Sequence, residues 1–247
     1  MKIFIFTSGI TSSNCIIMNK LLKDESIIID GIYFSLPQGG DYGYFFKFKR
    51  LFNYGVRNLI KIAYQKFIYS NNYEEKTVNK FKKLIKDKQI KLFYRNDFEI
   101  CLEKAKANSN LAILVYFNKI IKRKYISKKL KIINIHPSYL PAYKGVQPVF
   151  WSLYNNESTM GISMHLVDSG IDSGPVYKQI KVPTKTNSVN VNMFNISKIF
   201  SDKIIKIIKM IEDNKIFPKH QIKKKGKYYS RPNKTEIDFF LKYNKYF

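Results

Sequence analysis

Three polar residues near the middle of the chain have side chains of the types that acyl-group transfer requires. Asn134 and His136 lie two residues apart, so in an extended strand both side chains point to the same side. Asp172 follows in a turn of Ser and Gly residues, from which it can reach back to that strand end. An amide, an imidazole and a carboxylate together can stabilise an oxyanion and move a proton near neutral pH. The nearby carboxylate also predicts a raised pKa for His136.

The same residues have structural interpretations. A single His in a Pro-rich loop is commonly hydrogen-bonded to backbone, and an Asp beside Ser and Gly commonly forms a turn. Taken one at a time, each of the three residues is more often structural than catalytic. The stretch offers no nucleophile for a covalent acyl-enzyme, since Ser138 lacks the glycine-flanked elbow that exposes a nucleophilic serine.

The three residues are positioned by the strands and helices that the sequence pattern predicts around them. Strands separated by helical stretches of this length predict an α/β fold, with a Rossmann-like, mostly parallel sheet flanked by helices on both faces. Ligands of such sheets bind beyond the carboxyl ends of the strands, where the polar residues 8–14 and 134–138 fall. The predicted strands are residues 2–7, 27–36, 90–94, 112–116, 131–135, 161–168 and 176–182, and the predicted helices are residues 14–23, 74–86, 97–107 and 189–211.

The chain changes character at two places. Residues 37–70 read as an insertion whose later part, 44–70, is a basic, aromatic helical region. Its aromatic side chains face either a core or a surface that holds an anionic substrate or a membrane, and its role stays open. After residue 218 the chain becomes basic and then aromatic and polar. We therefore expect a catalytic domain over residues 1–217 and a short C-terminal appendage over residues 218–247.

The composition limits the possible partners. The net charge is +26, but the basic residues are mostly Lys and are spread along the whole chain, which favours no specific nucleic-acid role. No apolar run is long enough to insert into a membrane, and the first residues read as a strand rather than a signal peptide. Two scattered cysteines, Cys15 and Cys101, fit a reducing compartment and no metal site. These features together predict a cytoplasmic protein.

Several short motifs occur in a fixed order around the three polar residues. Residues 134–141 read N-I-H-P-S-Y-L-P, Gly145 follows, residues 161–165 read G-I-S-M-H, and residues 172–174 read D-S-G. This order resembles the hydrolase-like formyltransferase family, which includes glycinamide ribonucleotide, methionyl-tRNA and nucleotide-sugar N-formyltransferases. The resemblance is sharp over residues 132–179 and extends over residues 1–215.

The resemblance implies a reaction and roles. The formyl donor would be 10-formyltetrahydrofolate, and the Asn134 amide would donate to the formyl oxygen as it becomes an oxyanion. His136, protonated or hydrogen-bonded through Asp172, would stabilise the same charge and help to remove the proton of the attacking amine. The folate would lie near the end of the 112–116 strand, and a second loop would close its pterin pocket. The implied folate contacts are Phe117, Asn118, Lys119 and Ile120 in the first loop and Val167, Asp168 and Gly170 in the second.

Two regions suit an acceptor substrate. The loop after the first strand contains Ser8, Gly9, Thr11 and Ser12, which can hold a phosphate at a helix N-terminus. A simple N-cap by Ser12 or Ser13 explains the same residues equally well. Aromatic residues of the later loop, Tyr143 and Trp151, are also candidates for substrate contacts, although core packing explains Trp151 as well.

The resemblance narrows the acceptor to an amine on a nucleotide-linked amino sugar. Methionyl-tRNA formyltransferases carry a further β-barrel domain, and too few residues follow residue 218 for such a barrel. The C-terminal stretch resembles that of sugar N-formyltransferases, which favours dTDP-4-amino-4,6-dideoxyglucose, a lipopolysaccharide O-antigen precursor, and a homodimer. The alternatives are a methionyl-tRNA or glycinamide ribonucleotide formyltransferase and, from another class, a non-catalytic folate- or nucleotide-binding relative.

Overall fold

The computed structural model describes most of the chain. The described residues are 1–35, 55–61, 72–94, 97–126, 129–222, 226–243 and 245–246. The predicted helical region 44–70 lies largely outside them, and of it only residues 56–61 are described as a helix.

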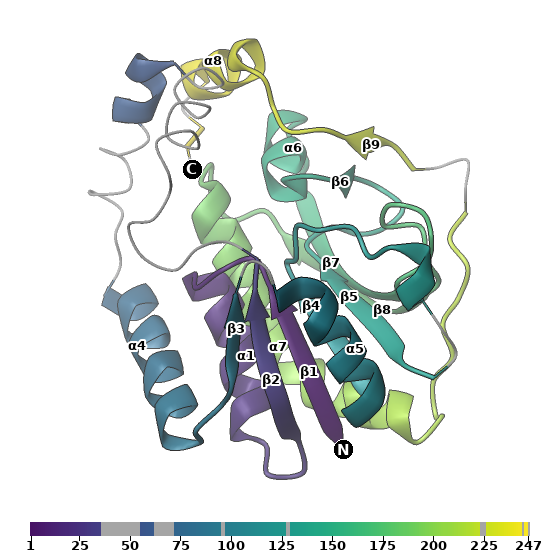
Figure 1. Cartoon of the computed structure of the whole chain (residues 1–247). Coiled ribbons are helices and arrows are strands. Elements are labelled where there is room, and N and C mark those ends of the chain that lie inside the picture. Colours follow the sequence, from purple (N-terminus) through teal and green to yellow (C-terminus); the bar gives the residue numbers. More distant parts are fainter. Residues whose placement is uncertain are drawn as a thin grey trace.

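A seven-stranded sheet forms the centre of the molecule (Figure 1). Its order is β3-β2-β1-β4-β5-β7-β8, in which the first five strands run parallel, β7 pairs antiparallel with β5, and β8 pairs antiparallel with β7. The α/β, mostly parallel fold predicted from the sequence is therefore confirmed. The strands are β1 (Lys2–Thr7), β2 (Ile28–Phe34), β3 (Leu92–Tyr94), β4 (Leu111–Val115), β5 (Lys131–His136), β7 (Thr159–Leu166) and β8 (Val176–Pro183).

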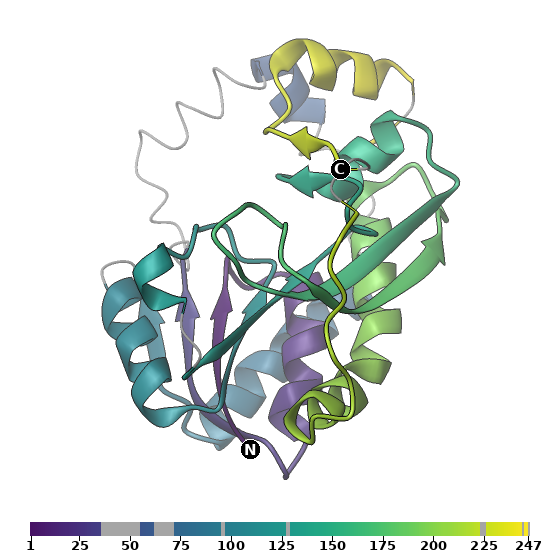
Figure 2. The ribbon, with the colours of Figure 1, turned by 90° about the vertical axis from the view of Figure 1, so that its right-hand side faces the viewer.

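Helices cover both faces of the sheet because its strands are apolar on both sides. In β1, Ile3 and Ile5 face one buried cluster, whereas Phe4 and Phe6 face another. Figure 2 shows α1 and α7 on one side of the sheet and α5 on the other. The helices are α1 (Ser12–Lys23), α4 (Asn72–Asp87), α5 (Phe98–Asn108) and α7 (Val189–Glu212), and a 3-10 turn, η2 (Arg123–Tyr125), follows β4.

The residues after α7 pack against the same core as the sheet. The strand β9 (Tyr228–Tyr229) pairs with β6 (Lys144–Gly145) in a second, two-stranded sheet. The helix α8 (Lys234–Lys242) covers α6 (Pro148–Tyr154), and the rings of Phe150 and Phe240 lie 4.4 Å apart. The sequence patterns predicted none of these four short elements. The division at residue 217 stays a prediction, although residues on both sides of it share one hydrophobic cluster.

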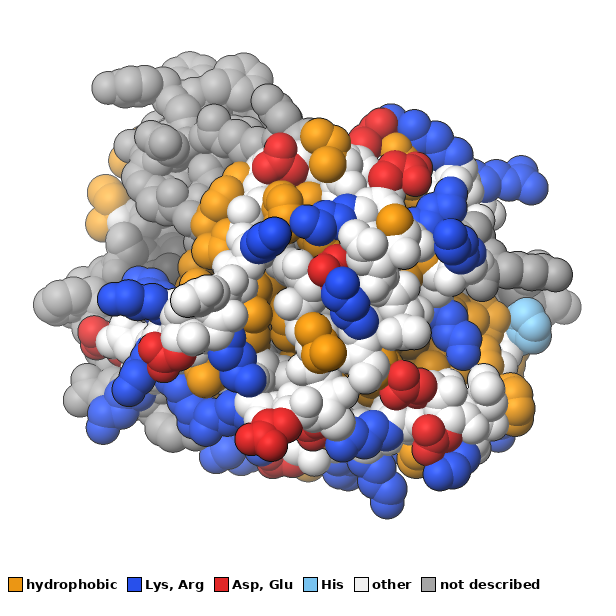
Figure 3. All heavy atoms as spheres, turned by 60° about the horizontal axis from the view of Figure 1, so that its bottom comes forward, with side chains coloured by type: hydrophobic (Ala, Val, Ile, Leu, Met, Phe, Trp, Pro, Cys, Tyr) orange, Lys and Arg blue, Asp and Glu red, His pale blue; other side chains and the backbone are white. Residues whose placement is uncertain are grey.

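The basic surface residues do not form one uniform patch on the face at the bottom of Figure 1. Figure 3 shows Lys and Arg side chains there with Asp and Glu side chains among them. Several form exposed ion pairs, such as Lys20 with Asp202 at 2.7 Å and Lys215 with Asp213 at 2.7 Å. Within the described residues, no helix has the length and apolar character needed to cross a membrane.

Candidate active site

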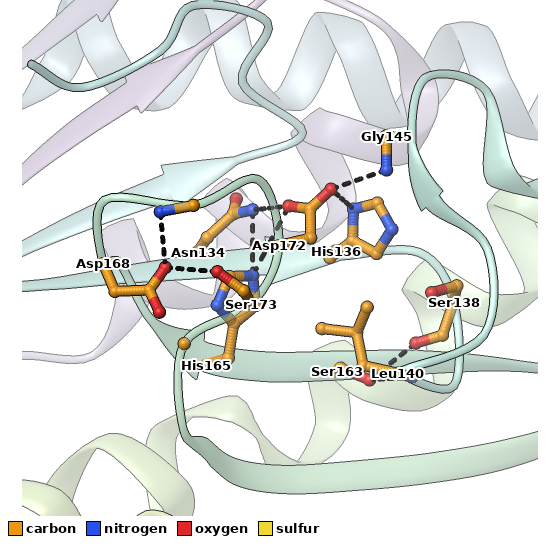
Figure 4. Close-up of polar contacts among 12 residues, drawn as sticks. Asn134, His136, Ser138, Leu140, Gly145, Ser163, His165, Asp168, Asp172 and Ser173 are labelled. Carbon is orange, nitrogen blue, oxygen red and sulfur yellow. Dashed lines mark hydrogen bonds and ion pairs between the residues drawn. The ribbon is translucent and has the colours of Figure 1, made fainter. Parts of the chain in front are cut away.

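Asn134 and His136 lie at the carboxyl end of β5, on the face of the sheet opposite to Ile133 and Ile135 (Figure 4). The antiparallel neighbour β7 places His165 directly across from Asn134. Directly opposed residues of antiparallel strands have close side chains, which explains the 3.2 Å between Asn134 Nδ2 and His165 Nε2.

The Asp172 carboxylate lies at the centre of this group. Its Oδ1 accepts a hydrogen bond from Asn134 Nδ2 at 3.2 Å, and its Oδ2 accepts one from the Gly145 backbone N–H at 2.8 Å. The nearest ring nitrogens of His136 and His165 are each 3.6 Å from a carboxylate oxygen, which is an ion-pair distance rather than a hydrogen bond. The structure thus brings the three residues proposed from the sequence together in one cluster, in which His136 is buried and Asn134 and Asp172 are partly exposed.

His165 belongs to the cluster but was not among the site residues proposed from the sequence. Its Nδ1 lies 2.7 Å from the Leu166 carbonyl, to which it donates, so Nε2 is left to accept from the Asn134 amide. This arrangement fixes the orientation of the Asn134 side chain. The available signal was its place as the last residue of the G-I-S-M-H motif.

The pKa of His136 lies below its usual value of 6.5, contrary to the rise expected from a neighbouring carboxylate. Burial disfavours the charged imidazolium, and this effect outweighs the attraction of Asp172 and the hydrogen bond to the Tyr143 carbonyl. The sequence revealed the carboxylate but not the depth of burial, since only 5% of His136 is exposed. A neutral His136 donates from Nε2 to Tyr143 at 2.9 Å and turns Nδ1 toward Asp172.

The carboxylate of Asp172 is ionised. Burial alone would raise its pKa, but His136, His165 and the Gly145 N–H outweigh burial and lower the pKa to about 2. The cluster therefore carries a negative charge at neutral pH, held by N–H donors on both carboxylate oxygens.

These two shifts predict that acid destabilises the fold. The folded pKa of His136 lies below its unfolded value, so below about pH 6.5 the unfolded chain binds a proton that the folded chain excludes. Asp172 acts in the same direction at lower pH, because its contribution is complete above its unfolded pKa and is lost as the pH falls toward about 2. Urea unfolding should show a free energy of unfolding that declines from neutral to acidic pH. A curve that stays as steep in His136→Gln would contradict the part assigned to His136.

Gly145 has to be a glycine. Its φ of 97° lies in the left-handed region, and a Cβ atom would lie 2.3 Å from the Tyr229 carbonyl oxygen. Gly145→Ala should therefore separate β6 from β9 and draw the N–H away from Asp172, costing at least ~2 kcal/mol of unfolding free energy. Urea unfolding measures this loss against Val146→Ala, a change at the more exposed next position. Equal stability of the two variants would refute the prediction.

The loop after β4 has the expected position but mixed side-chain roles. Phe117 packs against the aromatic cluster beneath the sheet edge, with its ring 5.8 Å from Phe6. Lys119 Nζ donates to the Tyr33 hydroxyl at 2.8 Å, and Asn118 is hydrogen-bonded to the Ser35 hydroxyl. Ile120 is 72% exposed. Phe117 and Lys119 thus already have partners within the protein.

The second predicted folate loop follows β7. Val167 packs against the same apolar cluster as Phe117, and its N–H donates to the Ile132 carbonyl at 2.9 Å. Asp168 Oδ1 accepts from the Gly170 N–H at 3.1 Å and from the Ser173 hydroxyl at 2.7 Å. Hydrogen bonds within the loop therefore stabilise its conformation. The folate contacts proposed for Val167, Asp168 and Gly170 stay predictions.

The loop between β1 and α1, containing Ser8 and Gly9, lies at the carboxyl edge of the sheet. Thr11 is the N-cap of α1, in place of Ser12 or Ser13, and accepts from the Asn14 N–H. The phosphate contact proposed for this loop stays a prediction.

The proposed aromatic contacts of the acceptor have partners inside the protein. Tyr143 stacks on Tyr229 with ring centroids 5.0 Å apart, and its hydroxyl donates to Glu157 at 2.6 Å. Trp151 is 6% exposed and donates from Nε1 to the Ser230 carbonyl at 2.9 Å. The structure gives Trp151 a packing role, which was the alternative interpretation.

The other candidate chemistries find little support in the described part of the chain. It contains no group of three or more His, Cys, Asp or Glu side chains able to hold a metal ion. Cys15 and Cys101 are free and buried, and burial raises the pKa of each thiol to about 12, which makes both unreactive.

The fold and the site define an α/β protein with a clustered amide, imidazole and carboxylate at the carboxyl edge of its sheet. A family model described as formyl transferase matches residues 69–201, which is more than half of the chain. The chain belongs to the formyl transferase family.

The relatives found by sequence and the solved structures with the same fold are different kinds of formyltransferase. A methionyl-tRNA formyltransferase from Thermodesulfovibrio yellowstonii is 32% identical over 117 residues, which are 46% of this chain and 38% of the relative. The chain thus matches well under half of that relative's length.

Among solved structures, WlaRD, a sugar 3N-formyl transferase in the presence of dTDP and 5-N-formyl-THF, has a TM-score of 0.59 at 22% identity, covering 94% of this chain and 70% of that chain. An N-formyltransferase from Helicobacter canadensis, in complex with folinic acid and dTDP-3-aminofucose, has a TM-score of 0.59 at 20% identity, covering 94% and 71%. At these identities the likeness shows the fold.

Proposed function

We propose that the protein is an N-formyltransferase that moves the formyl group of 10-formyltetrahydrofolate to the amine of a nucleotide-linked amino sugar. The observation that carries the proposal is the hydrogen-bonded and ion-paired cluster of Asn134, His136 and Asp172 in a chain of the formyl transferase family. A site with this donor set fits attack by an amine on a formyl carbon, because the reaction develops an oxyanion and releases a proton.

Asn134 is the donor for the oxyanion. Both hydrogens of its amide have partners now, Asp172 Oδ1 and His165 Nε2, each 3.2 Å from Nδ2. To reach the formyl oxygen, the amide exchanges one of these contacts for the substrate. The remaining contact then holds the amide in place, so the donor is preorganised when the charge develops.

His136 is the proton acceptor for the attacking amine. A neutral imidazole can take a proton, which agrees with its lowered pKa. The resulting imidazolium faces the Asp172 carboxylate with Nδ1 and keeps its Nε2 bond to the Tyr143 carbonyl, so the new charge has two partners. As the carbon–N10 bond breaks, the proton passes from His136 to the departing folate nitrogen, which balances the reaction.

The folate-binding surface in this proposal is the carboxyl edge beside β4 and β5. Phe117 and Val167, in the loops at 117–120 and 167–170, both pack on the apolar cluster below that edge. WlaRD and the Helicobacter canadensis protein, which share this fold, are described with 5-N-formyl-THF and folinic acid respectively. These observations support a reduced folate as the donor.

The sugar acceptor is supported by solved structures that share this fold over nearly the whole chain. WlaRD and the Helicobacter canadensis protein each match 94% of this chain. Both are described with dTDP or a dTDP-sugar. We propose dTDP-4-amino-4,6-dideoxyglucose as the acceptor, for a lipopolysaccharide O-antigen, with the diphosphate held by the loop 8–12.

Methionyl-tRNA is the second candidate acceptor. The net charge of +26 suits a polyanion, and the relative with 32% identity is named as an enzyme of that specificity. On the sugar proposal the same charge acts only as a general attraction for a diphosphate. Glycinamide ribonucleotide stays a third alternative, and a non-catalytic folate- or nucleotide-binding relative is a fourth.

A turnover assay with 10-formyltetrahydrofolate and a panel of acceptors separates these candidates. The panel contains dTDP- and UDP-linked amino sugars, glycinamide ribonucleotide and methionyl-tRNA, and tetrahydrofolate release is the readout. Release with an amino sugar alone supports the proposal, whereas release with tRNA alone replaces the acceptor. Binding of 5-formyltetrahydrofolate without turnover of any acceptor would identify a non-catalytic relative.

The assembly and the compartment are part of the same proposal. We propose a homodimer in the cytoplasm, which agrees with the two free cysteines. Sedimentation at the concentration of the turnover assay would test the dimer, because a monomer that is fully active rules it out as the working unit.

A further inference from the structure

The segment of residues 219–222 follows α7 and lies beside the start of β8, directly after the loop that carries Asp172. It lies beyond the family-matched residues 69–201. Lys219 forms an antiparallel bridge with Val176 at the start of β8, in which each N–H donates to the other carbonyl at 2.8 Å. This bridge fixes the segment beside the loop that carries Asp172.

The side chain of Gln221 extends from this segment to the catalytic loop. Its Nε2 donates to the backbone carbonyls of Asp172, at 2.9 Å, and of Gly174, at 2.8 Å. Its Oε1 is buried and has no hydrogen-bond partner among the described residues. A buried acceptor without a partner costs stability, so the value of Gln221 at this position lies in its two donors.

The loop that Gln221 contacts has a strained backbone. Asp172 has a φ of 47°, in the left-handed region, which costs a residue with a side chain of order 1 kcal/mol or more. A Cβ atom at Gly174 would lie 1.9 Å from the Leu166 carbonyl oxygen, so the chain turns tightly there. Such a conformation persists only where surrounding contacts fix it.

The strand β9, which follows later in the chain, supports Asp172 indirectly. Its Tyr229 pairs with Gly145 of β6. The N–H of Gly145 donates to Asp172 Oδ2 at 2.8 Å. Residues 219–222 and β9 thus support both the backbone and the carboxylate of Asp172.

We propose that Gln221 is a positioning residue that sets the Asp172 carboxylate against His136, and that residues 219–222 and the strand β9 supply the support for the catalytic loop. The inference rests on the proposed function for its kinetic consequence, but its structural part can be measured without turnover.

The test uses Gln221→Met, which keeps the length of the side chain and removes both donors. Phe217→Ala, at a 73% exposed position before the segment, is the control. The chain has only three histidines, so proton NMR can follow the titration of His136. Asp172 and His165 are the titratable groups that face His136, and Asp172 favours its charged form. We expect the His136 midpoint in Gln221→Met to move ~0.5 pH unit lower, because the carboxylate moves away.

With the amine that the enzyme formylates as substrate, kcat of Gln221→Met should fall about tenfold or more, while the affinity for 5-formyltetrahydrofolate stays unchanged. Gln221→Lys, which keeps a donor, should restore most of kcat, which a merely structural role would not require. Its own positive charge lowers the His136 midpoint, so only kcat is compared for this variant. A wild-type His136 titration in Gln221→Met, with kcat within about twofold of the control, overturns the proposal. If the Met variant does not fold, a folded Lys variant with a low kcat overturns the proposal, and one with a wild-type kcat supports it. If the wild-type protein turns over no acceptor, the His136 titration in Gln221→Met alone tests the positioning role. Failure of the proposed function is therefore distinguishable from failure of this inference.

Discussion

Asn134→Ala should lower kcat by about 100- to 1000-fold, because it removes the amide that donates to the developing oxyanion. The charge of the oxyanion exists only near the transition state, so the loss should appear in kcat. The affinity for 5-formyltetrahydrofolate, measured by calorimetry, should change little. Removing the amide also frees Asp172 Oδ1 and His165 Nε2 of their shared donor, which adds some loss of order in the cluster.

The matched control is Asn110→Ala. Asn110 precedes β4 at the amino edge of the sheet, where its side chain accepts from the Lys2 N–H at 2.9 Å. This variant should lose a little stability and keep its kcat. Full turnover in Asn134→Ala, measured as tetrahydrofolate release, would remove the oxyanion role assigned to the amide.

Asp172→Asn should lower kcat by a factor of about 100 or more and also destabilise the fold by ~1–3 kcal/mol. Both carboxylate oxygens accept from N–H groups, Oδ1 from Asn134 and Oδ2 from Gly145. An amide at position 172 has only one oxygen, so its NH₂ group must face one of these donors. The imidazolium of His136 would also lose the negative charge beside it.

Two measurements separate these effects. Urea unfolding gives the loss of stability, and kcat at a temperature where the variant is folded gives the chemical loss. The control is Asp213→Asn, which removes an exposed carboxylate paired with Lys215 at 2.7 Å and should change neither quantity by much. If Asp172→Asn retains wild-type kcat, the charge of Asp172 takes no part in the reaction.

The sheet and its long helices were predictable from the sequence because each is long and strongly patterned. β1 was predicted with the observed bounds, and α7, predicted over 189–211, extends over Val189–Glu212. β6 and β9 have two residues each, too few for any periodicity, and they pair only because distant parts of the chain meet.

The site was predictable in its chemistry and less so in its geometry. Residue types and spacing led to Asn134, His136 and Asp172, which lie together. His165 enters the cluster through its register opposite Asn134, and a register between strands cannot be read from one strand alone. The lowered pKa of His136 depends on burial by the whole fold, which no local pattern reveals.

The packing of α8 against α6 has a consequence for synthesis on the ribosome. Phe150 buries its ring against Phe240, and the Lys245 ammonium donates to Asn156 Oδ1 at 2.6 Å, 89 residues earlier in the chain. The five parallel strands and α6 are synthesised before α8, so the apolar face of α6 stays uncovered until α8 has been made. We expect nascent chains that stop before α8 to bind chaperones.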